Sequence, residues 1–510
     1  MPADPPAAPT RDPVALATLL AAFALALATR LYNLAAPFGY GYDGWLGAMY
    51  GNAARNLARN GFAAMRFVAT LDAGPVKFGD VQPHLHHPPL VWNLEALVLR
   101  VFGVSDVSEW SLRLLPSIAF LVALGLAYAI ARRLSTPRIG ALAALALAAL
   151  PMTGVYGGLV NYEPFVLAAE AGTYLCWLRW RETGAARDLA ATAALLAIGI
   201  LFDWFGAFVG IPIALEALLA RPRAARWPVT LLGCVAVATV AAVLVYYSVI
   251  YPGALAEIAH HAEYRAGASR TDMGGGSYGL VEWLGKQATS LRKGYTIPGL
   301  GLWIAGLGLA SRSARPELRR AALHGALLAC LGFLPLLTFP QAAFTHEFLS
   351  FSLGLSVAIG VALGLVTLTE VSPGARCVAI ALGIAFLCTA QHATWVRLSG
   401  ERHTDSAYRD LGHEIAAAVP FASGVVTPGQ DGNVWWPVMF YADRSLTMGI
   451  DSEEKLANVR RVPPRASAPV RYVVFTPVLF QQHEAFARAL IAAKVPAMQG
   501  QKILVFDLGP

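Results

Sequence analysis

Charged side chains are scarce in this chain. Asp, Glu, Lys and Arg make up 14% of its 510 residues, whereas 56% are hydrophobic and the mean hydropathy is +0.52. Soluble domains ordinarily carry about 25% charged residues, so this composition argues against a water-soluble protein. Uncharged runs such as 14–29, 228–250 and 348–369 have the length of a helix that crosses a bilayer. They lack the polar face of a soluble helix, and we therefore expect a polytopic α-helical membrane protein.

Cysteine is also rare, which excludes a disulfide framework. The five cysteines lie in apolar segments and show no metal-pair spacing: Cys176, Cys234, Cys330, Cys377 and Cys388.

The net charge of +7 comes largely from short loops between apolar runs. This distribution reports membrane topology and points away from nucleic acid as a partner. The first apolar run has no cleavage site after a short core, so we expect a retained span.

The basic loops set the orientation. Loops 131–138, 179–187, 221–226 and 311–320 should all be cytoplasmic by the positive-inside rule. They are compatible with one another if about eleven helices, and at most about thirteen, cross the plasma or inner membrane. The expected spans are roughly 14–35, 111–133, 139–156, 163–180, 188–203, 205–220, 228–250, 296–311, 321–339, 347–369 and 376–395.

This topology divides the chain into three parts. Residues 1–13, which are rich in proline, form a disordered cytoplasmic N-terminus, and residues 14–398 form the transmembrane domain. Outer loops are expected at 36–110 and 252–294. Within the first, segments 45–60 and 88–103 are expected to be helices that lie along the membrane surface, because 45–60 has one apolar stripe and 88–103 is too short and too charged to span.

Residues 399–510 form the third part, a small extracytoplasmic α/β domain. Segments 424–429, 471–477 and 501–508 are expected to be strands, and 408–419 and 479–493 to be helices. The domain has no Gly-rich phosphate fingerprint. We expect it to support the site or to dock an acceptor.

Unusual polar residues gather at the outer ends of the expected spans. They are Asp43, His84, His86, His87, Glu163, Asp203, His260, His261, His346 and Glu347. Ionisable groups at membrane depth are costly and are usually functional. Outer loops also contain polar residues without any function, and this explanation covers His260 and His261 well.

Four stretches carry a family resemblance. They are "DGWLGAMYGNAARNLARNGF", "HHPPLVWNLEALVLRVFGVSDVSEWSLRLLPS", "VNYEPFVLAAEAGTYLCWLRW" and "FTHEF". In this order they resemble the prokaryotic protein O-mannosyltransferase-like branch of the C-type glycosyltransferases, a superfamily that includes the lipid A aminoarabinose transferases. The resemblance covers most of residues 30–350.

The resemblance implies an enzyme that takes a sugar from a polyprenyl-phosphate carrier on the outer face of the membrane. Its general base would be Asp43, and transfer would invert the anomeric carbon. Many relatives have Asp-Glu at this point, but here Gly44 follows, so Glu163 becomes the candidate for the second carboxylate. Aminoarabinose-type relatives carry Lys before the Pro-Pro pair, where this chain has His87.

The chemistry of such a transfer requires two kinds of group. A carboxylate must take the proton of the attacking hydroxyl, which is worth roughly 10²–10⁴ in rate. Donors at the bilayer edge must hold the departing phosphate, and Arg30, His86 and His87 are suited to this. His346 and Glu347 would face the carrier by resemblance, or they simply form a polar helix start.

Other readings of these residues stay open. Asp43 precedes a helix and could serve as its N-cap, and Glu163 could act only on the dipole of the helix that Pro164 begins. His84, His86 and His87 could contact phosphate, ligate a divalent metal or be structural. The acceptor could be a protein, a lipid or a glycan. A flippase for lipid-linked saccharides and a non-catalytic carrier-binding protein are the alternative functions.

Overall fold

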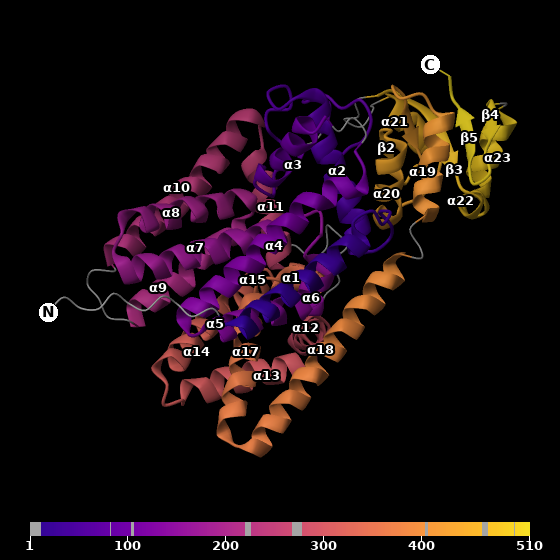
Figure 1. Ribbon diagram of the computed structural model, residues 1–510. Helices are drawn as coiled ribbons and strands as arrows, with labels where there is room; N and C mark the ends of the chain where they lie inside the picture. Colours follow the sequence, from indigo (N-terminus) through magenta and orange to yellow (C-terminus); the bar gives the residue numbers. More distant parts are fainter. Residues whose placement is uncertain are drawn as a thin grey trace.

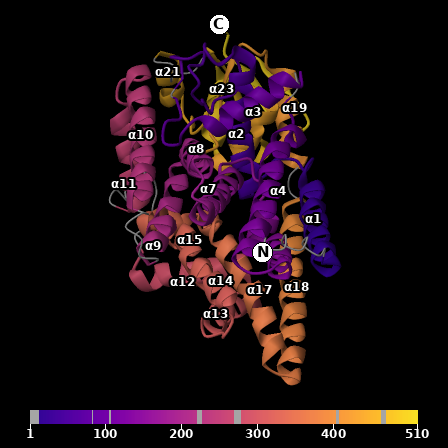
Figure 2. The ribbon, with the colours of Figure 1, turned by 60° about the vertical axis from the view of Figure 1, so that its left-hand side comes forward.

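The computed structural model describes residues 12–81, 83–103, 107–219, 226–267, 278–402, 406–461, 468–493 and 495–509. It consists of a large helical body and a smaller C-terminal sheet domain that lies against one end of the body (Figures 1 and 2). The expected disordered N-terminus lies almost entirely outside the described residues, as do most of loop 221–226 and residues 268–277 of the second outer loop.

The helical body follows the apolar runs of the sequence. Its helices are α1 (Pro13–Asn33), α2 (Tyr42–Asn60), α3 (Leu90–Val101), α4 (Glu109–Leu134), α5 (Pro137–Ala149), α6 (Pro151–Tyr156), α7 (Glu163–Thr183), α8 (Ala186–Phe202), η1 (Trp204–Val209), α9 (Gly210–Leu219), α10 (Arg226–Ile250), α11 (Ala254–Ala266), α12 (Leu280–Tyr295), α13 (Ile297–Ser311), α14 (Pro316–Leu328), α15 (Cys330–Thr338), α16 (Pro340–Thr345), η3 (Glu347–Ser350), α17 (Leu353–Val371) and α18 (Pro373–Arg402).

Six stretches within the described residues are long and apolar enough to cross a membrane. They are α1, α4, α10, the pair α14–α15, α17 and α18. Shorter apolar helices lie at 137–149, 204–219 and 297–311. Each of the expected spans coincides with a helix or a broken helix. The span expected at 139–156 is broken at Leu150 because Pro151 begins a new helix. The structure therefore supports a multi-pass membrane protein, and the count of eleven spans remains a prediction.

The basic loops meet at one end of the helical body. Glu182 accepts from Arg133 at 2.6 Å and from Arg320 at 2.7 Å, and Arg138 pairs with Asp12 at 2.7 Å. Such surface pairs contribute little stability, but they show that three basic loops and the start of α1 are neighbours. The beginning of α4 lies at the other end of the body, beside the C-terminal domain, as expected if the loops share one side of the membrane.

The expectation that 45–60 forms a surface helix was wrong. Helix α2 is largely buried, and Asn52 and Asn56 on its polar face are fully inaccessible. The polar face is buried because other segments satisfy it: Asn56 donates to the carbonyl oxygens of Thr70 and Asp72. Helix α3, the second expected surface helix, does expose apolar side chains, since Val101 and the following Phe102 are each at least 70% exposed.

The second outer loop carries two helices that the sequence analysis did not predict. They are α11 and α12, on either side of the residues that lie outside the description. Helix α11 lies against α10 and α16, and α12 lies against α6, α16 and η3. This segment is therefore a packed part of the helical body.

The C-terminal residues form a five-stranded mixed sheet in the order β2-β1-β3-β5-β4. Its elements are α19 (Ser406–Ala418), β1 (Gly424–Val426), α20 (Gly432–Ala442), β2 (Leu446–Thr447), α21 (Glu453–Arg461), β3 (Val470–Phe475), α22 (Pro477–Gln482), α23 (Glu484–Ala492), β4 (Ala497–Gln499) and β5 (Leu504–Asp507). Strands β2, β1 and β3 are parallel, and β5 is antiparallel to both neighbours. Strands β1, β3 and β5 lie where strands were expected, whereas α20 was not foreseen.

Helix α20 joins this domain to the helical body. It packs against α2, and Gly51 of α2 allows the close approach, since a Cβ there would lie 2.8 Å from the Phe440 ring. Arg55 donates to the carbonyl oxygen of Phe440 at 2.9 Å, and its guanidinium stacks 4.2 Å from the centre of that ring. Arg55 and Arg59 also form ion pairs with Asp443. The charged face of α2 is thus neutralised by the C-terminal domain.

Candidate functional site

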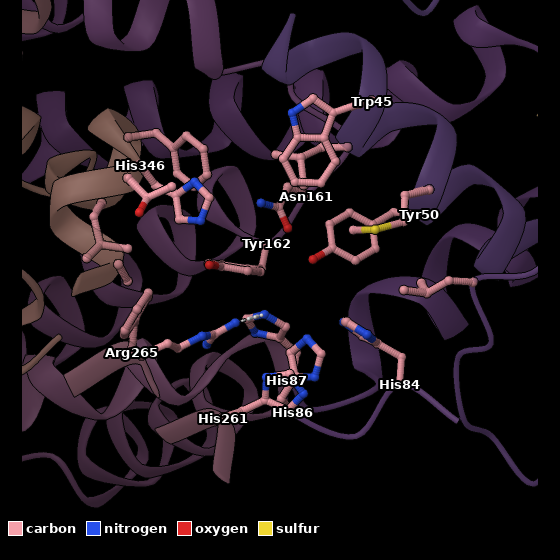
Figure 3. A pocket seen from close by; sticks show the side chains of 18 of the residues that line it. Trp45, Tyr50, His84, His86, His87, Asn161, Tyr162, His261, Arg265 and His346 are labelled. Atoms are coloured by element: carbon pink, nitrogen blue, oxygen red, sulfur yellow. Dashed lines mark hydrogen bonds between the residues drawn. The ribbon is translucent and has the colours of Figure 1, made fainter. Parts of the chain in front are cut away.

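A polar cavity of about 270 Å³ lies within the helical body (Figure 3). Its walls come from segments far apart in the chain: α2, the histidine segment 84–87, residues 161–162, α11, and residues 342–349. Figure 3 shows Trp45 and Tyr50 of α2 on one side and Arg265 of α11 with His86, His87 and His261 on the other. The cavity therefore brings together the histidine segment and both outer loops.

Backbone contacts hold the histidine segment in place. The carbonyl oxygen of His86 accepts from the Trp204 indole at 2.9 Å, and that of His87 accepts from the Tyr247 hydroxyl at 2.7 Å. The two prolines that follow disfavour helix, and α3 begins only at Leu90. The imidazole rings are thus presented to the cavity by an extended segment.

His87 is held in one tautomer by two partners. Arg265 donates to its Nε2 at 2.8 Å, and its Nδ1 is hydrogen-bonded to the carboxylate of Asp203. An arginine can only donate, so Nε2 must be unprotonated and the proton must lie on Nδ1, facing Asp203. The sequence left His87 open as a phosphate contact, a metal ligand or a structural residue. In this structure it is hydrogen-bonded to Arg265 and Asp203.

The remaining imidazoles are neutral as well. Burial, together with the neighbouring cations, lowers the pKa of His84, His86 and His87 well below the ordinary value. Burial and Arg265 lower the pKa of His261 and of His346 to about 4. The Nε2 of His84, Nδ1 of His86 and Nδ1 of His346 are buried without a partner among the described residues. These atoms can bind a ligand that brings its own donors or acceptors.

Among the residues that the structure describes, two sets have ligand atoms close enough together to hold a metal ion. In each of the sets His84–His86–His87 and His86–Glu257–His261 these atoms lie within 4.8 Å of one another. The first set was predicted from the sequence, but both nitrogens of His87 are already engaged. In the second set, Glu257 and His261 come from the same face of α11 and His86 comes from the histidine segment. Two imidazoles and one carboxylate are a donor set that suits Zn²⁺.

The sequence analysis did not identify Arg265 as a site residue. Glu257, His261 and Arg265 follow one another at intervals of four, so they share one face of α11. The four-residue spacing of Arg265 after His261 was the only signal in the sequence that pointed to Arg265 as a site residue. The partner that gives Arg265 its place, His87, is 178 residues away in the chain.

A second cavity of about 310 Å³ adjoins the first and is strongly apolar. It shares His86, His261 and Arg265 with the polar cavity, and its other walls include Val240 and Leu244 of α10. The Arg265 guanidinium therefore lies where an apolar cavity meets a polar one.

Asp43, the predicted base, lies in the first turn of α2 and does not line either cavity. Its Oδ2 lies 2.5 Å from an Nη of Arg113 and accepts from the Asn33 amide at 3.0 Å. The N-cap of α2 is Gly41, and Asp43 makes no capping hydrogen bond, so the alternative that Asp43 is the N-cap was wrong. Trp45 and Leu46, two and three residues further on, do line the polar cavity.

The departure from the Asp-Glu pattern has a structural reason. A Cβ on Gly44 would lie 2.1 Å from the carbonyl oxygen of Gly39, and one on Gly47 would lie 2.3 Å from the Phe38 ring. The loop before α2 is packed directly on the helix backbone. A glutamate in place of Gly44 cannot be accommodated in this arrangement.

Glu163, the predicted second carboxylate, is buried in the first turn of α7, below the polar cavity. Its Oε1 accepts from the Asn161 amide at 3.1 Å, and Oε2 has no partner among the described residues. Asn161 and Tyr162 line the polar cavity, whereas Glu163 lines a separate space of about 20 Å³, enough for one water molecule. Glu163 is thus one residue removed from the cavity wall.

The other residues predicted to bind the donor substrate lie in different surroundings in the structure. His346 lines the polar cavity, next to the Tyr42 and Phe348 rings. Glu347 is ion-paired with Arg397 and hydrogen-bonded to Tyr156, outside the cavity. Arg30 is buried in α1 and donates to the carbonyl oxygens of Thr153 and Gly154. Arg30 and Glu347 therefore hold helices together in this structure.

Both the sequence and the fold of this chain are similar to those of known proteins. Residues 86–251, from the histidine segment through α10, match the family model described as dolichyl-phosphate-mannose-protein mannosyltransferase. No curated protein sequence matches the chain. The crystal structure of ArnT from Cupriavidus metallidurans bound to undecaprenyl phosphate is 15% identical, with a TM-score of 0.66 over 96% of this chain and 99% of that one. The chain has the fold of the C-type glycosyltransferases.

Two further structures share this C-type glycosyltransferase fold. The apo oligosaccharyltransferase of Archaeoglobus fulgidus is 14% identical, with a TM-score of 0.60 over 93% of this chain and 71% of that one. The mycobacterial arabinofuranosyltransferase AftD is 16% identical, with a TM-score of 0.58 over 96% of this chain and 40% of that one. The resemblance drawn from the four sequence stretches is thereby confirmed, and at these identities the similarity is one of fold.

Proposed function

We propose that this protein transfers a sugar from a polyprenyl-phosphate carrier to an acceptor hydroxyl at the extracytoplasmic face of the membrane. One observation carries the proposal: Arg265 lies at the junction of a polar and an apolar cavity. A polyprenyl phospho-sugar has the matching order of groups, with an apolar chain, then a phosphate, then a sugar. Arginine binds phosphate through two parallel hydrogen bonds, and the chain would occupy the space beside Leu244.

The leaving group of this reaction is the carrier phosphate, on which negative charge grows. Arg265 is the cation available to it in the polar cavity, and the His87–Asp203 pair fixes the orientation of its guanidinium. The unpartnered nitrogens of His86 and His346 add neutral hydrogen-bonding groups. Preorganised donors of this kind stabilise developing charge without reorganising during the reaction.

Asp43 is the proposed base, and the placement of α2 supports this role. Trp45 and Tyr50 line the side of the cavity that faces Arg265 (Figure 3). A base on α2 would act on the face of the sugar opposite the departing phosphate, which is the geometry of inversion. Because Asp43 does not line the cavity in this structure, its carboxylate must then turn toward the cavity and exchange one of its present hydrogen bonds for the acceptor hydroxyl. Glu163, beneath Asn161, would orient the acceptor.

The test is a transfer assay on the purified full-length protein in nanodiscs, with a radiolabelled polyprenyl phospho-mannose as donor and protein, lipid and glycan acceptors. We expect a new glycosidic product and release of polyprenyl phosphate. Movement of the donor across vesicle membranes without a product would favour the flippase, and binding without turnover would favour a non-catalytic protein. Either result would overturn the proposal.

Two pairs of variants test the cavity junction. Arg265→Gln should weaken polyprenyl phosphate binding by about tenfold or more, because a charged hydrogen bond is lost, whereas Arg292→Gln on the exposed surface of α12 should not. Leu244→Trp should fill the apolar cavity and weaken binding of the long-chain carrier, whereas Val245→Trp, on the outside of the same helix, should bind normally.

A further inference from the structure

The C-terminal domain reaches the loop that carries Asp43 through a single tyrosine. The Tyr441 hydroxyl accepts a hydrogen bond from the backbone N–H of Phe38 at 2.6 Å and donates to Oε1 of Glu109 at 2.7 Å. Burial and the neighbouring Glu109 raise the pKa of Tyr441 above its ordinary value, so the hydroxyl keeps its proton and remains a donor. One side chain of α20 thus links the loop before α2 to the first turn of α4.

Both linked segments bear on Asp43 through Arg113. Glu109 and Arg113 are four residues apart on α4, and Arg113 forms the ion pair with Asp43. Phe38 is completely buried, its ring lies 4.7 Å from the Arg113 guanidinium, and it packs on Gly47 of α2. Loss of the Tyr441 hydroxyl would therefore loosen Arg113 and the Phe38 loop together.

We infer that Tyr441 is a positioning residue for sugar transfer: the C-terminal domain sets the place of the Asp43 carboxylate through the hydrogen bonds of Tyr441 to Phe38 and Glu109. The inference rests on the proposed function, since it assigns a purpose to the placement of Asp43. It also gives the C-terminal domain a role in the reaction without any residue of that domain touching the substrate. An error of about 1 Å in the place of a catalytic group can lower a rate by about 10²-fold.

The test uses Tyr441→Phe in the full-length protein, which keeps the aromatic ring and removes only the hydroxyl. We expect kcat for transfer to fall about tenfold while KM for the polyprenyl phospho-sugar stays within about twofold, because the carrier cavity is untouched. Glu109→Ala should reproduce the loss, and Glu109→Gln, which retains an acceptor oxygen, should restore most of the rate. Tyr472→Phe, in β3 of the same domain, is the matched control and should behave as wild type.

A double-mutant cycle separates positioning from general support. In an Arg113→Lys background, where the ion pair is already weakened, Tyr441→Phe should cost less than about twofold in kcat. An equal loss in both backgrounds, or a wild-type rate for Tyr441→Phe beside an active wild-type protein, would overturn the inference. If Tyr441→Phe does not fold, the same cycle is carried out with Glu109→Ala. Absence of transfer by the wild-type protein would instead count against the proposed function.

Discussion

Arg113 and Asp43 form a buried ion pair in which the guanidinium contacts both carboxylate oxygens, with Nη2 2.5 Å from Oδ2 and Nε 3.4 Å from Oδ1. The same guanidinium donates to the carbonyl oxygens of Asn33, at 3.0 Å, and Ala36. One arginine of α4 therefore holds both the proposed base and the loop that leads to it. Removal of either partner leaves the other buried without its counter-charge, which is costly.

Asp43→Asn should separate the chemical role of Asp43 from its structural one. Asparagine is nearly isosteric, and Arg113 retains its carbonyl acceptors, so we expect a folded protein that still binds the carrier but has a lower melting temperature. Transfer should fall by roughly two orders of magnitude or more, because the amide cannot take the proton. Kinetics and thermal unfolding of purified variants give the measurement, with Glu163→Gln alongside. Wild-type activity of Asp43→Asn would move the search for the base to Glu163.

Gly44→Glu recreates the Asp-Glu pair of many relatives and should nevertheless inactivate this protein. Its Cβ would lie 2.1 Å from the carbonyl oxygen of Gly39, so the loop before α2 would have to move. We expect a lower melting temperature and loss of transfer, and Gly44→Ala should share the defect. Gly285→Ala on α12, where a Cβ meets nothing within 4 Å, is the control. A fully active Gly44→Glu protein would show that the packing is not required.

Measurement of the metal content tests whether the histidines of the polar cavity are metal ligands. If His86, Glu257 and His261 hold a divalent ion, elemental analysis of the purified protein should find about one equivalent, and His261→Ala and Glu257→Gln should each lose it. His84→Ala should retain the metal, since His84 is outside this set. If the ion is catalytic, chelation should abolish transfer and a divalent ion should restore it. Full activity in excess chelator with no bound metal would leave phosphate contact or structure as the role of these residues.

Glu95 should make stability fall as pH rises. It lies on α3, where burial raises its pKa well above the ordinary value, and neither carboxylate oxygen has a partner among the described residues. Above about pH 4.5 the folded state therefore binds this proton more tightly than the unfolded state does, so the free energy of unfolding declines with pH until the folded pKa is passed. Glu95→Gln should flatten the profile of melting temperature between pH 5 and 8 and should be more stable than wild type at pH 8. Identical profiles for the two proteins would refute this.

Cysteine labelling tests the orientation. In a background without the five native cysteines, Arg138→Cys, exposed at the start of α5, should resist a membrane-impermeant thiol reagent in intact cells. Gln430→Cys, which is exposed in the C-terminal domain, should react. Both should react after the cells are permeabilised. Labelling of Arg138→Cys from outside would reverse the predicted topology and place the cavity on the cytoplasmic side.

Much of the fold was contained in local sequence patterns. The uncharged runs determine the long membrane helices, because every backbone polar group in a bilayer must be satisfied within the helix. Pro164 marks a helix start, and the continuous apolar run within 471–477 marks a buried strand. The C-type resemblance was also visible, because its motifs are short and continuous. The expected topology put the histidine segment and His346 on the same side of the membrane, whereas their gathering at one cavity came from the tertiary structure.

Contacts between distant segments were decided only by the tertiary structure. The polar face of α2 was read as a solvent-facing surface because nothing in its own sequence shows that Asp443, more than 380 residues away, neutralises Arg59. The hydrogen bonds of His87 could not be foreseen either, because its partners Asp203 and Arg265 lie 116 and 178 residues away in the chain. A charge pattern fixes which residues need partners, since an unpaired buried charge is costly. Which partners they receive depends on how whole helices pack, and that is a property of the complete chain.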